Sequence, residues 1–219
     1  MSNFVSARCA FGAVALFVTA AADAGFVFQS ASRETEASVG GAVVQVANTL
    51  GFTSWFGSAR ANTAAHAVLA TQGSSLLGNE MTFVGAAQLN STTDTALAAR
   101  SAASVTFVAD ATESVRWIAD LWQEAFGAGT TASIALSVFD LTASSAEIAF
   151  AGPVLGSGSF TVDAGHTYRI EILATVGSSG SSNAVANYNI GLFGDSLPVP
   201  APGAVALLAL AGLAGCRRR

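Results

Sequence analysis

The chain has no lysine, only two cysteines and few charged residues. Of its 219 residues 11% are charged and 52% are hydrophobic, and all nine basic residues are arginine. Between residues 25 and 196 five arginines face 13 acidic residues, so this stretch carries a formal charge of −8. A surface of that sign repels phosphate backbones, and we therefore expect no nucleic-acid partner. The high apolar content also excludes a disordered acidic chain.

The scarcity of cysteine and histidine limits disulfides and metal sites. Cys9 and Cys216 lie close to the two ends, so the stretch between them cannot build a disulfide framework. His66 and His166 have no second histidine or cysteine at ligand spacing, which argues against zinc, and we expect both to be surface or loop residues. We expect no cofactor, although carbonyls and scattered carboxylates leave calcium binding open.

Signatures of catalysis are lacking as well. The sequence has no Gly-x-Ser-x-Gly elbow, no phosphate loop and no dinucleotide fingerprint. A pair of carboxylates for glycoside hydrolysis could come from six acidic residues, but no spacing singles out a pair: Glu80, Glu113, Asp120, Glu124, Glu147 and Glu171. We expect no catalytic residues and no enzyme, and keep an uncharacterised extracellular hydrolase as an alternative.

The N-terminus has the pattern of a secretory signal peptide. Arg8 precedes an uncharged run from Cys9 to Ala22, and small residues occupy Ala22 and Ala24 on either side of Asp23. A basic start, a short apolar stretch and a small-x-small site predict cleavage after Ala24, with the secretion translocon as a partner. The alternative is a buried core helix or an uncleaved anchor, but the run is shorter than the roughly 20 residues that a spanning helix needs.

The C-terminus combines prolines, an apolar segment and arginines in that order. Three of the four prolines fall between residues 198 and 202, an apolar segment follows from Ala204 to Cys216, and Arg217, Arg218 and Arg219 end the chain. Prolines this close stop a preceding strand. The apolar segment predicts a short transmembrane helix, and the positive-inside tendency places the arginines on the cytoplasmic side.

This tail resembles the PEP-CTERM sorting signal of Gram-negative bacteria that make exopolysaccharide. The signal's Pro-Glu-Pro tripeptide is replaced here by Pro200, Ala201 and Pro202, as in the Val-Pro-Ala-Pro-Gly variants. The resemblance implies an exosortase-type membrane protease as a partner, transient anchoring in the inner membrane, cleavage near Pro200–Pro202, and delivery to the cell surface or the exopolysaccharide matrix. An ordinary tail anchor is the alternative.

The stretch from 25 to 196 predicts one all-β domain. Short apolar alternations, rich in β-branched and aromatic residues, recur about every ten residues between turn-forming residues. They lie at 104–108, 131–141, 146–150, 159–162, 168–176 and 185–193. In the clearest of them, Tyr168, Ile170 and Ile172 should face inward and Arg169 and Glu171 outward. Residues 30–75 are less readable and should hold two or three edge strands with long loops.

This spacing favours an antiparallel β-sandwich of about eight to ten strands, between the signal helix and the transmembrane helix. The part from Phe160 through Tyr168 to the last strand is similar to the closing part of jelly-roll domains, which implies a jelly-roll-like sandwich.

Residues 113–126 fit two structures. As a helix, Val115, Ile118, Trp122 and Phe126 would share one stripe, with Gly127 as the stop. As a strand, Val115, Trp117, Ala119 and Leu121 would alternate with polar residues. The strand is the preferred interpretation over 114–121.

The functional interpretation is a non-enzymatic exported protein of the surface or matrix, with a carbohydrate-binding module as the alternative. Trp55–Phe56, Trp117 and Trp122 could form a platform for sugar rings, and Asn187 and Asn189 could bond hydroxyl groups. Trp117 and Phe126 lie in an amphipathic stretch, which more often places such residues in the core. Trp55, in a loop-like stretch between Gly51 and Gly57, is therefore the candidate glycan-binding residue, and exopolysaccharide the candidate ligand.

We predict that the mature chain begins at Gly25, because Ala22 and Ala24 occupy the small positions that follow the apolar run. N-terminal sequencing of exported protein measures this directly. Exported protein that still begins at Met1 would contradict the signal peptide.

Overall fold

The computed structural model describes residues 25–49 and 51–195, and these form two antiparallel β-sheets packed as a sandwich. Twelve strands run through this part of the chain: β1 Phe26–Val39, β2 Ala42–Asn48, β3 Trp55–Asn62, β4 His66–Leu77, β5 Glu80–Ser91, β6 Leu97–Ala109, β7 Glu113–Phe126, β8 Thr131–Asp140, β9 Ser145–Ala151, β10 Val154–Val162, β11 Thr167–Ser178 and β12 Ser182–Gly194. The signal peptide at 1–24 and the sorting signal at 197–219, with their expected helices, lie outside the described residues. Within them no helix is long and apolar enough to span a membrane.

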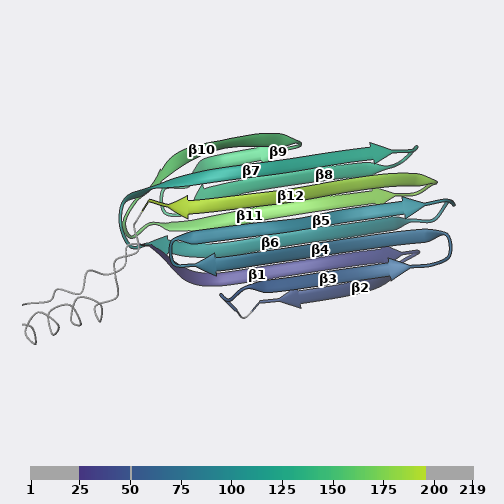
Figure 1. Ribbon diagram of the computed structural model, residues 1–219, viewed down its shortest axis with the longest axis horizontal. Helices are drawn as coiled ribbons and strands as arrows, with labels where there is room; N and C mark the ends of the chain where they lie inside the picture. Colours follow the sequence, from purple (N-terminus) through teal and green to yellow (C-terminus); the bar gives the residue numbers. More distant parts are fainter. Residues whose placement is uncertain (1–24, 50, 196–219) are drawn as a thin grey trace, which may run out of the picture. The chain divides into compact units, whose positions relative to one another are not determined.

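Each sheet has six strands, and Figure 1 shows the strands of one sheet overlying those of the other. Sheet A has the order β2-β1-β6-β11-β8-β9, and sheet B has the order β10-β7-β12-β5-β4-β3. From β5 onward the pairs are nested, because β8 pairs with β9, β6 with β11 and β5 with β12, while β7 pairs with β10 in the other sheet. The hairpins β1–β2 and β3–β4 extend this eight-stranded unit on one side of each sheet.

The strands expected from alternation are confirmed, and they are longer than expected. Each of the six expected ranges overlaps a strand from β6 to β12, and Tyr168, Ile170 and Ile172 are buried. The expected eight to ten strands are too few, because β5 was not expected and the chain up to Leu77 holds four strands rather than two or three. Over 30–75 the expectation of edge strands is confirmed for β2 and β3, whereas β1 and β4 are interior strands. The long loops expected there are replaced between β1 and β2 by the two glycines Gly40 and Gly41.

The ambiguous segment is a strand. β7 covers Glu113–Phe126, with Val115, Ala119 and Leu121 buried between the sheets. β7 pairs with β10 on one side and with β12 on the other, so its backbone forms hydrogen bonds along both edges. A helix at this position would lose these hydrogen bonds, and its apolar stripe would have no second helix to pack against.

The core lies between the inward faces of the sheets. Phe26, Phe107 and Tyr168 form an aromatic row, with ring centroids 4.8 Å and 5.5 Å apart. Phe83, Phe160 and Tyr188 are further aromatic core residues, and the rest of the core consists mainly of Ile, Val, Leu and many Ala residues. The described residues contain no cysteine, so apolar contact and not a disulfide holds the two sheets together there.

One hydrogen-bonded chain crosses the core from sheet to sheet. The Tyr188 hydroxyl, on β12, lies 2.8 Å from Ser101 Oγ on β6, and Ser101 Oγ donates to the carbonyl oxygen of Thr71 on β4 at 2.7 Å. Burial is the largest cause that raises the pKa of the Tyr188 phenol far above its ordinary value. The Tyr188 side chain is therefore neutral in the core, and its hydroxyl group has a hydrogen-bond partner there.

A second polar group in the core is Arg33, whose side chain is fully buried. Its Nη1 donates to the carbonyl oxygen of Gly51 at 2.8 Å, and burial lowers the pKa of the guanidinium. Its Nε and Nη2 have no hydrogen-bond partner among the described residues. Arg33 therefore connects β1 to the segment that precedes β3.

The Tyr188 ring occupies the space that a side chain at Gly85 would need. A Cβ atom added at Gly85 would lie 2.4 Å from the phenol and 2.7 Å from the backbone oxygen of Thr71. Gly85→Ala should therefore lower the free energy of unfolding by about 1–3 kcal/mol, the usual cost of overpacking.

Urea denaturation of both proteins measures the difference. Gly78→Ala is the matched control, because a Cβ atom there would meet nothing within 4 Å, and its effect should stay within about 0.5 kcal/mol. Equal stability of Gly85→Ala and the wild-type chain would contradict this packing.

Candidate functional site

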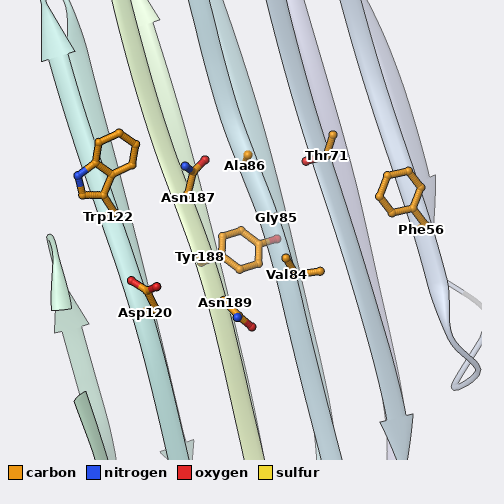
Figure 2. Close-up of a pocket in the computed structure, with 10 residues that line it drawn as sticks. All are labelled: Phe56, Thr71, Val84, Gly85, Ala86, Asp120, Trp122, Asn187, Tyr188 and Asn189. Carbon is orange, nitrogen blue, oxygen red and sulfur yellow. The ribbon is translucent and has the colours of Figure 1, made fainter. Parts of the chain in front are cut away.

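A hollow of about 550 Å³ lies on the outer face of sheet B. It is lined from five adjacent strands by Phe56, Thr71, Val84, Gly85, Ala86, Asp120, Trp122, Asn187, Tyr188 and Asn189. Figure 2 shows Phe56 and Trp122 on opposite sides, with Asn187, Asn189, Ala86 and Val84 between them. The hollow is thus an apolar and amide-lined depression between two exposed aromatic rings.

The pairing register explains how residues far apart in sequence meet here. One row across the sheet consists of Phe56, Gly73, Val84, Asn189 and Asp120. The next outward-facing row consists of Ser58, Thr71, Ala86, Asn187 and Trp122. At about 4.8 Å per strand spacing, the strands that carry Phe56 and Trp122 are about 19 Å apart. The surface is hollowed between them because Gly73, Thr71 and Ala86 in these rows have short side chains or none.

The two aromatic walls are exposed. Phe56 is 70% exposed, and a Cβ atom at Gly73 would lie 3.5 Å from its ring, so Phe56 lies beside the bare backbone of β4. Trp122 is 43% exposed on β7. Large apolar side chains that remain in water beside a depression are typical of a binding surface.

The other two tryptophans do not line this hollow. A Cβ atom at Gly57 would collide with the Trp55 indole at 2.2 Å, so the half-buried Trp55 lies over Gly57. Gly57 and Phe56 are adjacent in the strand and face opposite sides of the sheet, so Trp55 points away from the hollow that Phe56 lines. Trp117 is partly buried and packs against Phe150 of sheet A, with ring centroids 5.1 Å apart. Trp117 is thus part of the core, whereas Phe126 is 60% exposed and lies outside it.

The polar groups of the hollow are two amides and one carboxylate. Asn187 and Asn189 come from β12 and Asp120 from β7, and Asp120 and Asn189 are directly paired. Amides donate and accept hydrogen bonds at one position, and a carboxylate only accepts. Such groups suit a ligand rich in hydroxyls. Phe56, Trp122, Asn187 and Asn189 were expected from the sequence to contribute to a sugar-binding platform, but Thr71, Val84 and Ala86 carry no sequence signal of binding.

The six acidic residues considered for glycoside hydrolysis are dispersed. Glu147 and Glu171 lie on strands of sheet A, and Glu80 and Glu113 begin β5 and β7. Asp120 and Glu124 share the outer face of β7 but are four residues apart, about 13 Å along a strand. This backbone spacing is wider than the roughly 6.5–9.5 Å that separates the carboxyl groups of inverting glycosidases.

An Asp–His pair joins the end of β8 to the turn between β10 and β11. His166 Nδ1 lies 2.7 Å from Asp140 Oδ2, and Asp140 Oδ1 accepts the backbone N–H groups of Thr142 and Ala143 at 2.7 and 2.9 Å. Burial opposes ionisation of Asp140, but these hydrogen bonds outweigh it and lower its pKa below 3.8. The bond to Asp140 raises the pKa of His166 above 6.5.

The contacts of this pair are structural, because they connect two segments of the chain. Among the described residues no hydroxyl or thiol hydrogen-bonds the other ring nitrogen of His166, so a nucleophile is missing from a triad. His166 lies in a turn, as expected, while His66 begins β4, where its Nδ1 lies 3.0 Å from Ser91 Oγ. Within the described ranges no three His, Cys, Asp or Glu side chains are grouped as metal ligands.

The Asp140–His166 pair should make stability depend on pH. The ion pair contributes fully to the free energy of unfolding between pH 3.8 and 6.5. This contribution is lost as the pH rises through the raised pKa of His166, which then loses its proton. It is also lost as the pH falls through the lowered pKa of Asp140, which then gains one. The free energy of unfolding lost in His166→Gln should therefore be largest between pH 3.8 and 6.5.

Urea denaturation over a pH series measures this loss. In an Asp140→Asn background, His166→Gln should show no such maximum. A loss that is the same at every pH in the wild-type background would contradict the ion pair.

Comparison of the chain with protein-family models, with curated proteins and with solved structures finds no match in any of the three.

Proposed function

We propose that this protein is a non-enzymatic, exported polysaccharide-binding protein of the cell surface or exopolysaccharide matrix. The observation that carries the proposal is the depression between Phe56 and Trp122, with its floor of small residues and its amides. The hollow binds the sugar chain, and no residue of it acts chemically on the ligand.

The two kinds of lining match the two kinds of surface that a sugar ring has. The C–H faces of a pyranose are apolar and gain free energy when they cover an aromatic ring, at roughly 25 cal/mol per Å² of area removed from water. The hydroxyl groups at the ring's edge bond to Asn187, Asn189 and Asp120. Thr71 and Ala86 are short enough to let the ring descend between the walls.

Two features support the non-catalytic role. The backbones of the outer-face residues Asp120 and Glu124 are about 13 Å apart, wider than the spacing of the usual acid and base pair, and the Asp140–His166 pair joins the end of β8 to a turn, with its carboxylate occupied by backbone N–H groups. In this proposal the domain holds a polysaccharide without cleaving it, and its retention in a matrix follows from binding.

The nested strand pairs support the jelly-roll proposal for the domain. Two four-stranded sets, β10-β7-β12-β5 and β6-β11-β8-β9, have the order that two Greek keys give when a long hairpin is rolled into a sandwich. In this proposal β1–β4 are additions that widen both sheets. The wider sheet B contributes Phe56 and Thr71 to the hollow.

Export and sorting rest on the tails. The signal peptide delivers the chain to the translocon, and the Pro200–Pro202 motif and Arg217–Arg219 present it to an exosortase-type protease. The resemblance of residues 197–219 to the sorting signal supports this route. Release beside newly made exopolysaccharide would bring the hollow to its ligand.

Trp122→Ala tests the proposed function. The variant should bind oligosaccharides at least about tenfold more weakly, a loss of about 1.4 kcal/mol, because it removes one wall of the hollow. A glycan array with the purified full chain identifies a ligand, and isothermal titration measures its affinity for both proteins.

Ile118→Ala is the matched control, since Ile118 is 49% exposed on the same face of the same strand but does not line the hollow. It should bind like the wild-type chain. An array without any bound glycan, or equal affinities of Trp122→Ala and the wild-type chain, would refute polysaccharide binding at this site.

A further inference from the structure

A second hollow of about 490 Å³ adjoins the first on the outer face of sheet B. The two hollows share Trp122 and Asn187. The second one is lined by four further amides, Asn62, Gln88, Asn90 and Asn183, and by Arg60. Where the first hollow has aromatic walls, the second has hydrogen-bonding groups.

The register places the two hollows one after the other along the strands. Asn62, Asn90 and Asn183 stand in one row, six residues along each strand from the row of Phe56, Val84 and Asn189. Six residues of a strand span about 20 Å. One continuous surface of this length exceeds what a single sugar ring covers.

An unsatisfied acceptor lies where the hollows meet. Asn187 Oδ1 is buried and has no hydrogen-bond partner among the described residues. A buried acceptor without a partner costs free energy, and rotation about the last torsion of the side chain can turn it toward a hydroxyl of a bound chain. The junction is therefore suited to a ligand that continues from one hollow into the other.

The net charge of the domain disfavours anions. Asp120 lines the first hollow, and Glu124 and the cation Arg116 lie on the same face of β7. Arg60 lines the second hollow and keeps its positive charge, but two of its donors are already used, because the Asn62 amide oxygen, in the orientation that satisfies both groups, accepts from its Nε and Nη2 at 2.6 and 2.7 Å. With a formal charge of −8 over residues 25–196, the domain repels polyanions.

From these observations we infer that the amide-lined hollow is a second subsite, and that the two hollows together bind an internal stretch of an uncharged, linear polysaccharide. This inference rests on the proposed function and adds the length and charge of the ligand. The aromatic hollow supplies most of the contact with a sugar face, and the amide-lined hollow recognises the hydroxyl groups of the sugars that follow.

The test combines a length series with a variant of the second hollow. The probes are oligosaccharides of neutral β-glucan and mannan, from disaccharide to hexasaccharide, and alginate oligomers of equal length as the anionic counterpart. Isothermal titration uses the full chain, Trp122→Ala, and the double variant Asn90→Ala with Asn183→Ala. Both asparagines are exposed, and urea denaturation checks that the variants fold.

The wild-type chain should bind at least one neutral series with an affinity that rises about tenfold or more with length. The double variant should keep the disaccharide affinity within about twofold and lose the gain with length, whereas Trp122→Ala should lose affinity at every length. An affinity that is independent of length, a double variant that matches the wild-type chain on the hexasaccharide, or a preference for alginate would overturn this inference alone. Absence of binding to every probe would overturn this inference, and absence of binding to every glycan of the array as well would overturn the proposed function with it.

Discussion

The bridge from Tyr188 through Ser101 to Thr71 fixes the distance between the sheets where the proposed site lies. Tyr188 belongs to the strand that carries Asn187 and Asn189, and Thr71 itself lines the aromatic hollow. The phenol fits only because position 85 is glycine. The floor of the hollow is thus held from below by a buried hydrogen-bond network, and the exposed residues add their chemistry to a surface whose position is already set.

The sequence predicted those strands whose alternation is carried by large residues. From Tyr168 to Ile172, apolar and charged side chains alternate strictly, and the expected faces are confirmed. β5 was missed because its Gly85, Ala86 and Ala87 have low strand propensity, so that pairing with β4 and β12 decides its structure. For 113–126, the strand was preferred because polar residues alternate with Val115, Ala119 and Leu121.

The site was only partly predictable, because a sheet surface depends on register. Trp122, Asn187 and Asn189 were recognised as sugar-binding types, yet the sequence does not say that β7 and β12 are neighbours or that Asp120 pairs with Asn189. It also could not separate Trp55 from Phe56, since adjacent residues of a strand point to opposite sides and the choice depends on which side the other sheet covers.

The same alternation gives neighbouring residues of sheet B separate roles, and this separation affects which substitutions the domain tolerates. Positions such as 84, 86, 187 and 189 face water, and the residues between them form the core. Outward residues can therefore change without opening cavities or overpacking, while the bridge beneath keeps the backbone in place. A lineage that meets a new polysaccharide can alter its groove by single substitutions and keep its fold, so related chains are expected to differ most where they bind.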